Sequence, residues 1–183
     1  DLTANNIRYD RFPFATWAKV MRETLTDYNT SLLKTVPFNG VLQLREAISD
    51  HLNRYRGMQV SADHIIIGAG TEYLYNRLLQ LLGPDVKFGV ENPGYHKITK
   101  IYDENGVDWD YVNIDDKGMK VDELRMKDIN VAHVSPEHHF PIGLVMPVAR
   151  RQELLNWAAE EPGRYIIEDD FDCCLLYTSP SPR

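Results

Sequence analysis

Residues 64–84 read HIIIGAGTEYLYNRLLQLLGP. The apolar run at 64–67 predicts a short strand, and Gly68 and Gly70 predict a turn directly after it. Apolar residues then recur at helical spacing up to Gly83-Pro84, at Leu74, Leu78, Leu81 and Leu82. The stretch is therefore predicted to form a strand, a glycine-containing turn and a helix.

The same alternation continues toward the C-terminus. We expect further strands at 86–90, 107–112, 131–134 and 165–167, and helices at 95–104, 121–126 and 148–159. In the last helix, Leu155, Ala158 and Ala159 are expected to face inward. Strands that alternate with helices favour an α/β fold of three layers, a mostly parallel sheet with helices on both faces.

The segment before this pattern is more mixed. It predicts a helix at 14–28 and a turn at VPFNG, residues 36–40. A second helix begins at Leu42 and ends before Gly57, with an apolar stripe at Leu44, Ile48, Leu52 and Tyr55. Residues 1–40 are therefore expected to form an arm that leads into a domain over 41–173.

Composition excludes several classes of protein. The chain has 183 residues, of which 43% are hydrophobic, and a formal net charge of −7. No stretch approaches the roughly 20 apolar residues of a membrane span, and the negative charge argues against nucleic-acid binding as the main role of this segment. The two cysteines, Cys173 and Cys174, are adjacent and cannot form a disulfide framework. A cytoplasmic protein is therefore expected.

Both ends of the chain predict a piece of a longer protein. The sequence begins at Asp1 without a signal peptide, and residues 174–183 read CLLYTSPSPR. This decapeptide matches the translation of a transposon-end sequencing adapter, so we expect it to be an artefact. The alternative is a natural flexible tail rich in serine and proline.

Candidate site residues follow the predicted strands, because parallel α/β sheets bind ligands beyond the carboxyl ends of their strands. GAGT at 68–71 opens a helix, and free backbone N–H groups there favour an anion. A tight connection without a ligand is the alternative. Tyr95, in ENPGYHK at 91–97, is placed either to cover a flat ligand ring or to pack on a neighbouring helix.

Two further loops carry polar residues at this edge. SPEHHFPIG at 135–143 contains His138 and His139, and EDDFD at 168–172 follows the last predicted strand. A carboxylate there would hold a protonated nitrogen or a metal, or the acids would be a solvated loop or a helix N-cap. A metal would recruit a histidine of the first loop with Asp169, Asp170 or Asp172, although no established metal-ligand spacing supports it.

Taken in order, these blocks resemble one family. They are FPF with Trp17, Asn39-Gly40 with Leu44-Arg45, IIIGAGTEYL, VENPGYHK, VSPEHHFPIGLVMP, RRQELLNWA and IIEDDFD. The chain resembles the fold-type-I aminotransferases that use pyridoxal 5′-phosphate (PLP), and is most similar to the aminotransferase-like domain of MocR/GabR-type regulators. The resemblance spans residues 1–173, so it implies that 41–173 are part of the PLP-binding large domain.

The resemblance implies roles for single residues. Asp169 would pair with the pyridine nitrogen of PLP as the catalytic carboxylate. Phe171 stands where the family usually has a tyrosine that contacts the ring's phenolic oxygen, and Lys97 where GabR-type proteins carry an arginine for the substrate carboxylate. Tyr95 would stack on the ring. The cofactor-binding set that the resemblance implies is Gly70, Thr71, Glu72, Tyr95, His138, Asp169 and Phe171, with Ala69 as an alternative to Glu72 at the phosphate.

The resemblance also implies what this segment lacks. The lysine that forms the Schiff base follows the acidic strand by a few dozen residues in the family, so the chain alone is predicted to be inactive. The parent would be a homodimer that transfers an amino group between an amino acid and a 2-oxo acid, or a regulator that senses an amine or PLP and binds DNA through a preceding domain. The alternative is a non-catalytic α/β domain with a metal held by His138 or His139 and the acids at 169–172.

Overall fold

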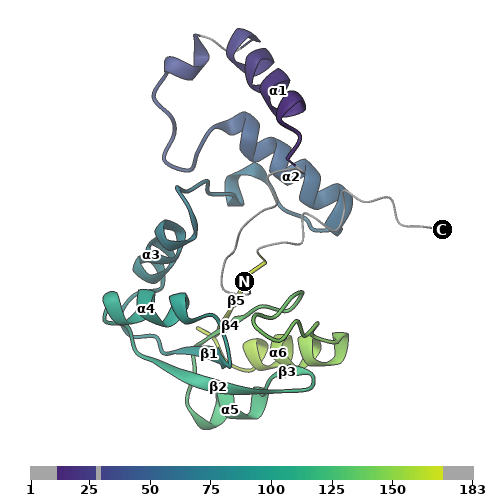
Figure 1. Ribbon diagram of the computed structural model, residues 1–183. Helices are drawn as coiled ribbons and strands as arrows, with labels where there is room; N and C mark the ends of the chain where they lie inside the picture. Colours follow the sequence, from purple (N-terminus) through teal and green to yellow (C-terminus); the bar gives the residue numbers. More distant parts are fainter. Residues whose placement is uncertain (1–11, 28–29, 171–183) are drawn as a thin grey trace, which may run out of the picture. The chain divides into compact units, whose positions relative to one another are not determined.

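The computed structural model describes residues 12–27 and 30–170, and it divides into two compact units (Figure 1). The first, called the N-terminal unit here, contains the described residues up to Arg54 together with 58–67. The second, called the sheet unit, contains residues 55–57 and the described residues from Gly68 onward. The predicted adapter segment and Phe171 lie outside the described residues.

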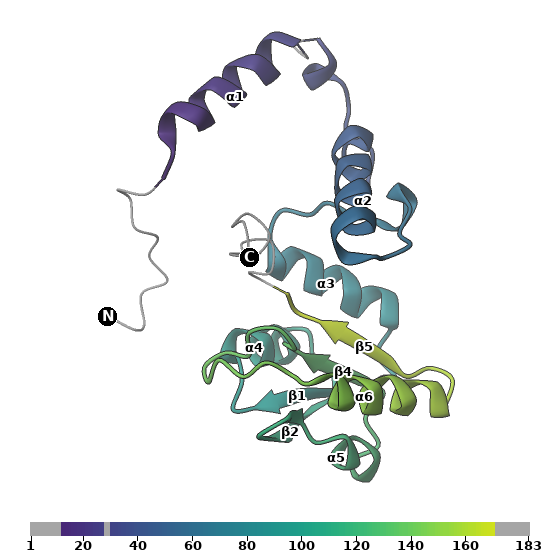
Figure 2. The ribbon, with the colours of Figure 1, turned by 90° about the vertical axis from the view of Figure 1, so that its right-hand side faces the viewer.

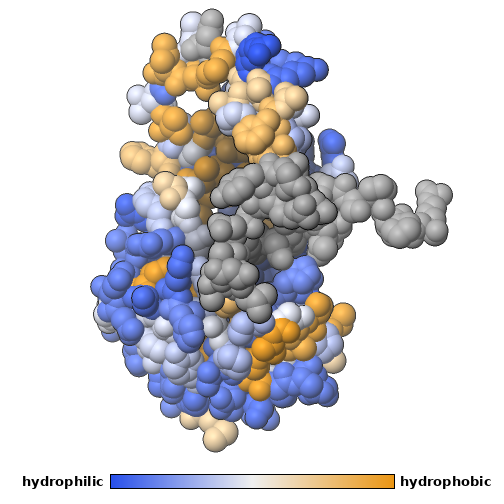
Figure 3. All heavy atoms as spheres, in the orientation of Figure 1, coloured by the Kyte–Doolittle hydropathy of each residue, from blue (hydrophilic) through white to orange (hydrophobic). Residues whose placement is uncertain are grey.

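The N-terminal unit is built from short helices. They are α1 (Phe14–Asp27), the 3₁₀ turn η2 (Ser31–Leu33), α2 (Leu42–Arg56) and the 3₁₀ turn η3 (Ala62–His64). The helices predicted at 14–28 and from Leu42 are thus confirmed, and Gly57 follows α2 in the left-handed conformation with φ of 62°. No residue of α1 is buried, and its apolar side chains contribute to the exposed hydrophobic surface of this unit (Figure 3).

The apolar stripe predicted for α2 is only half right, because Ile48 and Leu52 are half-buried but the residues at its two ends are not. Leu44 and Tyr55 are exposed, and the buried residues of α2 are Arg45 and Ser49. The Ser49 hydroxyl donates to the Val60 carbonyl at 2.6 Å, and Arg45 donates to the Ala62 carbonyl at 2.6 Å. Because the returning chain places the carbonyl groups of Val60 and Ala62 on this face, polar donors are buried there in place of leucine.

The strand predicted at 64–67 does not form. The amide of Ile65 donates to the Ala62 carbonyl inside η3, and the amide of Ile67 donates to the Asn39 carbonyl in the preceding turn. A strand requires a neighbouring strand for its backbone groups, and these local bonds replace that ladder. The helix behind it forms as predicted.

The sheet unit alternates strands and helices as the sequence predicts. Its elements are α3 (Thr71–Leu82), β1 (Phe88–Asn92), α4 (His96–Glu104), β2 (Trp109–Asp115), β3 (Gly118–Met119), α5 (Val121–Met126), β4 (Val131–Val134), α6 (Val148–Glu160) and β5 (Tyr165–Glu168). The strand order is β3-β2-β1-β4-β5, with parallel pairing except between β2 and β3. A mostly parallel α/β sheet is therefore confirmed.

Two differences concern the first half of the sheet. β1 and β2 begin two residues later than predicted, because Phe88 pairs with Trp109 and the ladder continues to Asn92 and Asn113. The antiparallel strand β3 was not predicted. Its two residues, Gly118 and Met119, are too few to leave a periodic pattern in the sequence.

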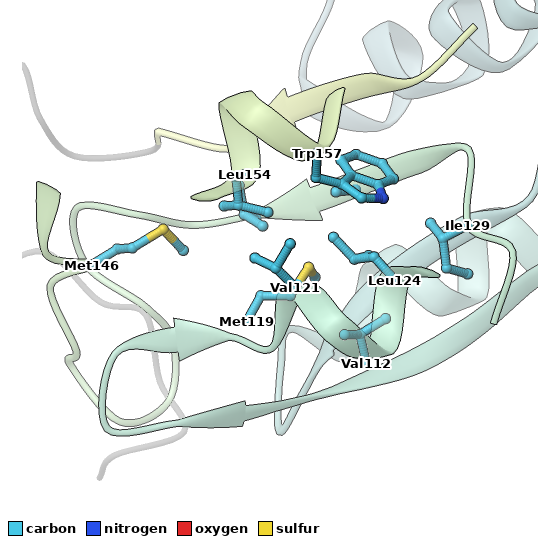
Figure 4. Packing of buried hydrophobic residues seen from close by; sticks show 10 residues of the cluster. Val112, Met119, Val121, Leu124, Ile129, Met146, Leu154 and Trp157 are labelled. Atoms are coloured by element: carbon cyan, nitrogen blue, oxygen red, sulfur yellow. The ribbon is translucent and has the colours of Figure 1, made fainter. Parts of the chain in front are cut away.

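Helices cover both faces of the sheet, as Figure 2 shows. One core contains side chains from α3, α4, β1 and β4, among them Tyr75, Ile98, Phe88 and Val131. The other contains side chains from β2, β3, α5, β4 and α6 and from adjoining loops. Figure 4 labels Val112, Met119, Val121, Leu124, Ile129, Met146, Leu154 and Trp157 of this core. β4 therefore contributes to both cores, because successive side chains of a strand point to opposite faces.

The inward face of α6 differs in part from the prediction, since Ala158 packs against the core but Leu155 and Ala159 are exposed. Leu154 and Trp157 are buried with Arg150, whereas Leu155 is 57% exposed. Arg150 donates to the Gly118 carbonyl and to Asp115, so its charge is paired inside the fold. Because the buried face of α6 contains an arginine, its apolar pattern in the sequence is interrupted.

The helices of the described residues are all too short or too polar to cross a membrane.

Candidate functional site

A cleft lies at the carboxyl ends of β1 and β4 and beside the residue that follows β5. Its lining includes Glu91, Tyr95, His133, Ser135, Phe140 and Asp169. The cleft has a free volume of about 30 Å³, which is room for about two water molecules. A larger group would therefore lie in the open mouth of the cleft.

Asp169 enters this cleft directly after β5. Its amide donates to the Val134 carbonyl at 2.8 Å, which continues the ladder of β4 and β5 by one bond. The next residue, Asp170, is ion-paired with Arg56, and both side chains are mostly buried. The two adjacent acids thus have different environments: one faces the cleft and the other is held by a guanidinium.

Tyr95 lies at the other side of the cleft, at the N-cap of α4. Its side chain is 42% exposed, and its ring meets Phe140 edge-on at 5.9 Å between centroids. The ammonium group of Lys97 lies 6.0 Å from the centroid of the same ring. Tyr95 and Asp169 are therefore brought together by the structure as lining residues of one cleft.

Behind Asp169 lies a buried polar cluster that sequence reasoning missed. The His133 ring of β4 is within 3.1 Å of the Tyr75 hydroxyl and 2.7 Å of the Tyr102 hydroxyl. Burial lowers the pKa of His133 to about 4, so the imidazole is neutral. Burial, followed by the charge of Asp169, raises the pKa of both tyrosines. The available signal was a histidine inside the apolar run VAHV.

A second buried pair lies beside the cleft. Oε2 of Glu91 is 3.3 Å from Nε2 of His139 and accepts a hydrogen bond from the Ser135 amide at 3.0 Å. Burial raises the pKa of Glu91 to about 7, against the opposing effect of the Ser135 amide, and nearby Asp169 raises it further. Burial also lowers the pKa of His139. In this buried site the charged forms of both side chains are therefore disfavoured.

The N-terminus of α3 provides free donors near this cluster. Gly70 is the N-cap, with φ of 104° and no side-chain capping bond, and Thr71 and Glu72 are exposed. The first N–H groups of a helix lack acceptors within the helix. Thr71 and Tyr75 are four residues apart and therefore lie on one face of α3, about 5–6 Å apart between Cβ atoms. Tyr75 links this terminus to Asp169.

Other predicted residues, Gly70, Thr71 and Glu72 among them, do not line the cleft. His138 is exposed, and its neighbours His139 and Phe140 face the cleft region instead. Lys97 reaches the site only through the ring of Tyr95, and Phe171 and Asp172 lie outside the described residues. Within 12–27 and 30–170, no group of three histidine, cysteine, aspartate or glutamate side chains is arranged to hold a metal.

Comparison with known families decides the classification. The family model for aminotransferase class I and II matches residues 1–170. The chain belongs to this family. The resemblance identified from the sequence blocks is thereby confirmed.

Curated relatives of this aminotransferase-family chain are regulators. The HTH-type transcriptional regulator YdeL of Bacillus subtilis (strain 168) is 34% identical over 178 residues, which cover 97% of this chain and 38% of YdeL. PdxR of Corynebacterium glutamicum, an HTH-type pyridoxine biosynthesis transcriptional regulator, is 37% identical over 141 residues, 77% of this chain and 31% of PdxR. The chain thus spans less than half the length of these relatives.

Solved structures of aminotransferases share the fold. An archaeal alanine:glyoxylate aminotransferase has a TM-score of 0.78 and 27% identity over 91% of this chain and 43% of its own. The kynurenine aminotransferase of Pyrococcus horikoshii, solved in complex with PMP, has a TM-score of 0.75 and 26% identity over 87% of this chain and 41% of its own. The family and such complexes indicate pyridoxal phosphate as the cofactor.

The residues present fit this cofactor. Asp169 supplies a carboxylate at the cleft, Tyr95 supplies a partly exposed aromatic ring, and α3 begins with uncapped N–H groups. A Cβ atom added at Gly70 would meet nothing within 4 Å, so the chain leaves open space at that terminus. Carboxylate, aromatic and anion-binding groups are the set that a cationic ring bearing a phosphate requires.

Proposed function

We propose that the sheet unit is the cofactor-binding part of a pyridoxal-phosphate-dependent protein, with Asp169 and Tyr95 as its central contacts. The observation that carries this proposal is the meeting of both residues in one cleft at the carboxyl edge of the parallel sheet. Tyr75 connects that cleft to the N-terminus of α3. A carboxylate, an aromatic face and an anion site are therefore joined within one unit.

Each group has a defined task in this proposal. The Asp169 carboxylate accepts a hydrogen bond from the protonated ring nitrogen, and its negative charge favours that protonation. The amides at Thr71 and Glu72 and the Thr71 hydroxyl bind the phosphate at a helix N-terminus. Tyr95 covers one face of the ring. When bound, the cofactor supplies an electron sink for bonds at the substrate's α-carbon.

For the whole protein we propose a MocR-type regulator in which this domain senses an amine or amino acid. The support is that the curated relatives named above are HTH-type regulators. Its DNA binding would reside in a segment other than the one described, and its site would be completed in a homodimer. An aminotransferase acting on an amino acid and a 2-oxo acid is the second candidate, favoured by the solved structures of such enzymes.

Asp169→Asn in the full-length protein tests the proposed site. The amide keeps nearly the same shape but removes the charge, so the dissociation constant of pyridoxal phosphate should rise roughly tenfold. Titration followed by cofactor absorbance measures it. Asp116→Asn, at an exposed position of the β2–β3 turn, is the matched control and should leave affinity unchanged. Equal affinity of Asp169→Asn and the unaltered protein would refute the site.

The two parent activities are separable in the same preparation. A regulator should bind its DNA with an affinity that changes on addition of an amine, and it should form no 2-oxo acid. An aminotransferase should convert an amino acid to its 2-oxo acid at a measurable rate. Assays of DNA binding and of 2-oxo acid formation therefore decide between them.

A further inference from the structure

The buried cluster behind Asp169 joins four residues from different elements. Tyr75 comes from α3, Tyr102 from α4 and His133 from β4, and Asp169 follows β5. The His133 ring is hydrogen-bonded at both nitrogens, Nδ1 to the Tyr102 hydroxyl at 2.7 Å and Nε2 to the Tyr75 hydroxyl at 3.1 Å. The Asp169 side chain lies beside this cluster: it lines the same cleft as His133, and after burial its charge and its hydrogen bonding raise the pKa of the Tyr75 hydroxyl. The four groups form one continuous chain.

The chemistry of the groups fixes the direction of this chain. An ionised carboxylate only accepts hydrogen bonds, so the Tyr75 hydroxyl donates to Asp169. Its oxygen must then accept from Nε2–H of His133. A neutral imidazole has one donor and one acceptor, so Nδ1 accepts from the Tyr102 hydroxyl. Each proton in this chain of hydrogen bonds is thereby assigned to one atom, and the Tyr75 hydroxyl is the donor to Asp169.

The cluster is buried deeply enough to remain in this state. Tyr102 is fully buried, and Tyr75 and His133 are almost so. Burial keeps the imidazole neutral, with a pKa of about 4, and both phenols protonated. Breaking any link would leave a polar group without a partner inside the core, which is costly.

We propose that Tyr75, His133 and Tyr102 are positioning residues that orient the Asp169 carboxylate toward the ring nitrogen of the cofactor. The proposal rests on the proposed function. The relay donates one hydrogen bond to Asp169 and adds no charge of its own, so the carboxylate keeps its full charge for the ring. It also ties the residue to α3 and α4, whereas its own backbone amide bonds to β4.

The first test measures the tautomer of His133 in the cofactor-free, full-length protein labelled with ¹⁵N-histidine. The His133 signals are assigned by their disappearance in His133→Gln. We expect the proton on Nε2, with Nδ1 unprotonated, unchanged between about pH 6 and 8 because the pKa lies near 4. A proton on Nδ1, or a titration within that range, would overturn the relay whatever the cofactor does.

The second test is a double-mutant cycle on cofactor affinity. Tyr75→Phe should raise the dissociation constant of pyridoxal phosphate about fivefold, because Asp169 loses the hydrogen bond that orients it. In the Asp169→Asn background the same change should have almost no further effect, because Tyr75 acts through Asp169. Tyr165→Phe, at the exposed start of β5, is the matched control.

The outcomes separate the relay from the proposed function. Additive effects of Tyr75→Phe and Asp169→Asn would show that Tyr75 has only a structural role, and would overturn the relay while the cofactor site stands. An effect of Tyr75→Phe equal to that of Tyr165→Phe would do the same. An unchanged affinity in Asp169→Asn, together with a His133 proton on Nε2, would overturn the proposed function and with it the task of the relay.

Discussion

The carboxylate of Glu91 lies in a poorly solvated position. Its carboxyl group is almost fully buried beside His139, and one oxygen accepts a hydrogen bond from the Ser135 amide. Burial raises its pKa from 4.5 to about 7. The folded protein therefore holds a proton on Glu91 over a range of pH in which the unfolded chain has already released it.

This shift predicts a pH dependence of stability. Between about pH 4.5 and 7 the folded state binds more protons than the unfolded state, so the free energy of unfolding should fall as pH rises through that window. The full effect is on the order of 3 kcal/mol. Glu91→Gln removes it, because an amide still accepts from the Ser135 amide but does not titrate. Urea unfolding at pH 5 and pH 8 measures the difference.

Glu104→Gln, an exposed position of α4, is the control and should follow the unaltered protein at both pH values. The lowered pKa of His139 acts in the opposite direction, and because His139 lies 3.3 Å from Glu91 the difference between the variants reports both groups of this pair. A steeper pH dependence in Glu91→Gln would contradict the prediction.

At the scale of elements, Arg150 fastens α6 to the β2–β3 hairpin. Its guanidinium donates to the carbonyls of Gly118 and Met119 and to the Asp115 carboxylate. Burial of Asp115 is outweighed by hydrogen bonds from Arg150 and Lys117, which lower its pKa. The outer strand of this hairpin, β3, has only two residues, so its backbone hydrogen bonds to β2 are few. The hydrogen bonds from Arg150 make up for them.

Arg150→Met should lower the free energy of unfolding by about 3 kcal/mol, because buried acceptors lose their donor. It should also speed hydrogen exchange at the Lys120 amide, which donates to the Asn113 carbonyl. Arg77→Met, on the exposed side of α3, should change stability by less than about 0.5 kcal/mol. Slow exchange at Lys120 in Arg150→Met would show that the hairpin holds without this contact.

The same elements show what the sequence could reveal. Long periodic segments such as α3 and α4 and the apolar runs of β4 and β5 were predicted because spacing alone identifies them. The run at 64–67 has strand composition, but its partners are a turn and η3, which composition does not encode. The buried stripe of α6 contains Arg150, and β4 contributes His133 to the buried polar cluster. A prediction based on hydrophobicity misses polar residues that are buried because they are paired.

For the candidate site, loop residues after strands were easier to find than the groups that support them. Asp169 and Tyr95 follow apolar runs and could be named from position. Tyr75 and His133 lie inside a helix and a strand, and their meeting depends on how α3 packs on the sheet. Contacts between elements distant in sequence require the tertiary structure.

At the scale of the whole molecule, the described part of the cleft contains no lysine among its lining residues. An amine must lie at the carbonyl carbon of the cofactor to bond with it covalently. Mixed with pyridoxal phosphate and reduced with borohydride, the 183-residue chain should therefore give only weak, scattered labelling of lysines. Mass spectrometry of the digested protein locates the adducts, and an unrelated protein of similar lysine content provides the reference.

A single stoichiometric adduct at one lysine would contradict this prediction. Lys97 is the residue to inspect, since its ammonium group lies over the ring of Tyr95. Lys97→Arg, which keeps the charge but removes the nucleophile, would then abolish the adduct if that lysine were responsible.

Successive residues of β4 belong to different layers: Val131 and His133 face α3 and α4, while Ala132 and Val134 face α5 and α6. The length of this segment is consequently subject to a parity rule. Insertion or deletion of one codon would turn the imidazole into the layer of Leu154 and Trp157 and an aliphatic side chain toward the two phenols. Only changes by two residues keep His133 on the same side of the sheet as Tyr75 and Tyr102. Related proteins that carry this cluster should therefore vary the length of β4 in even steps or not at all.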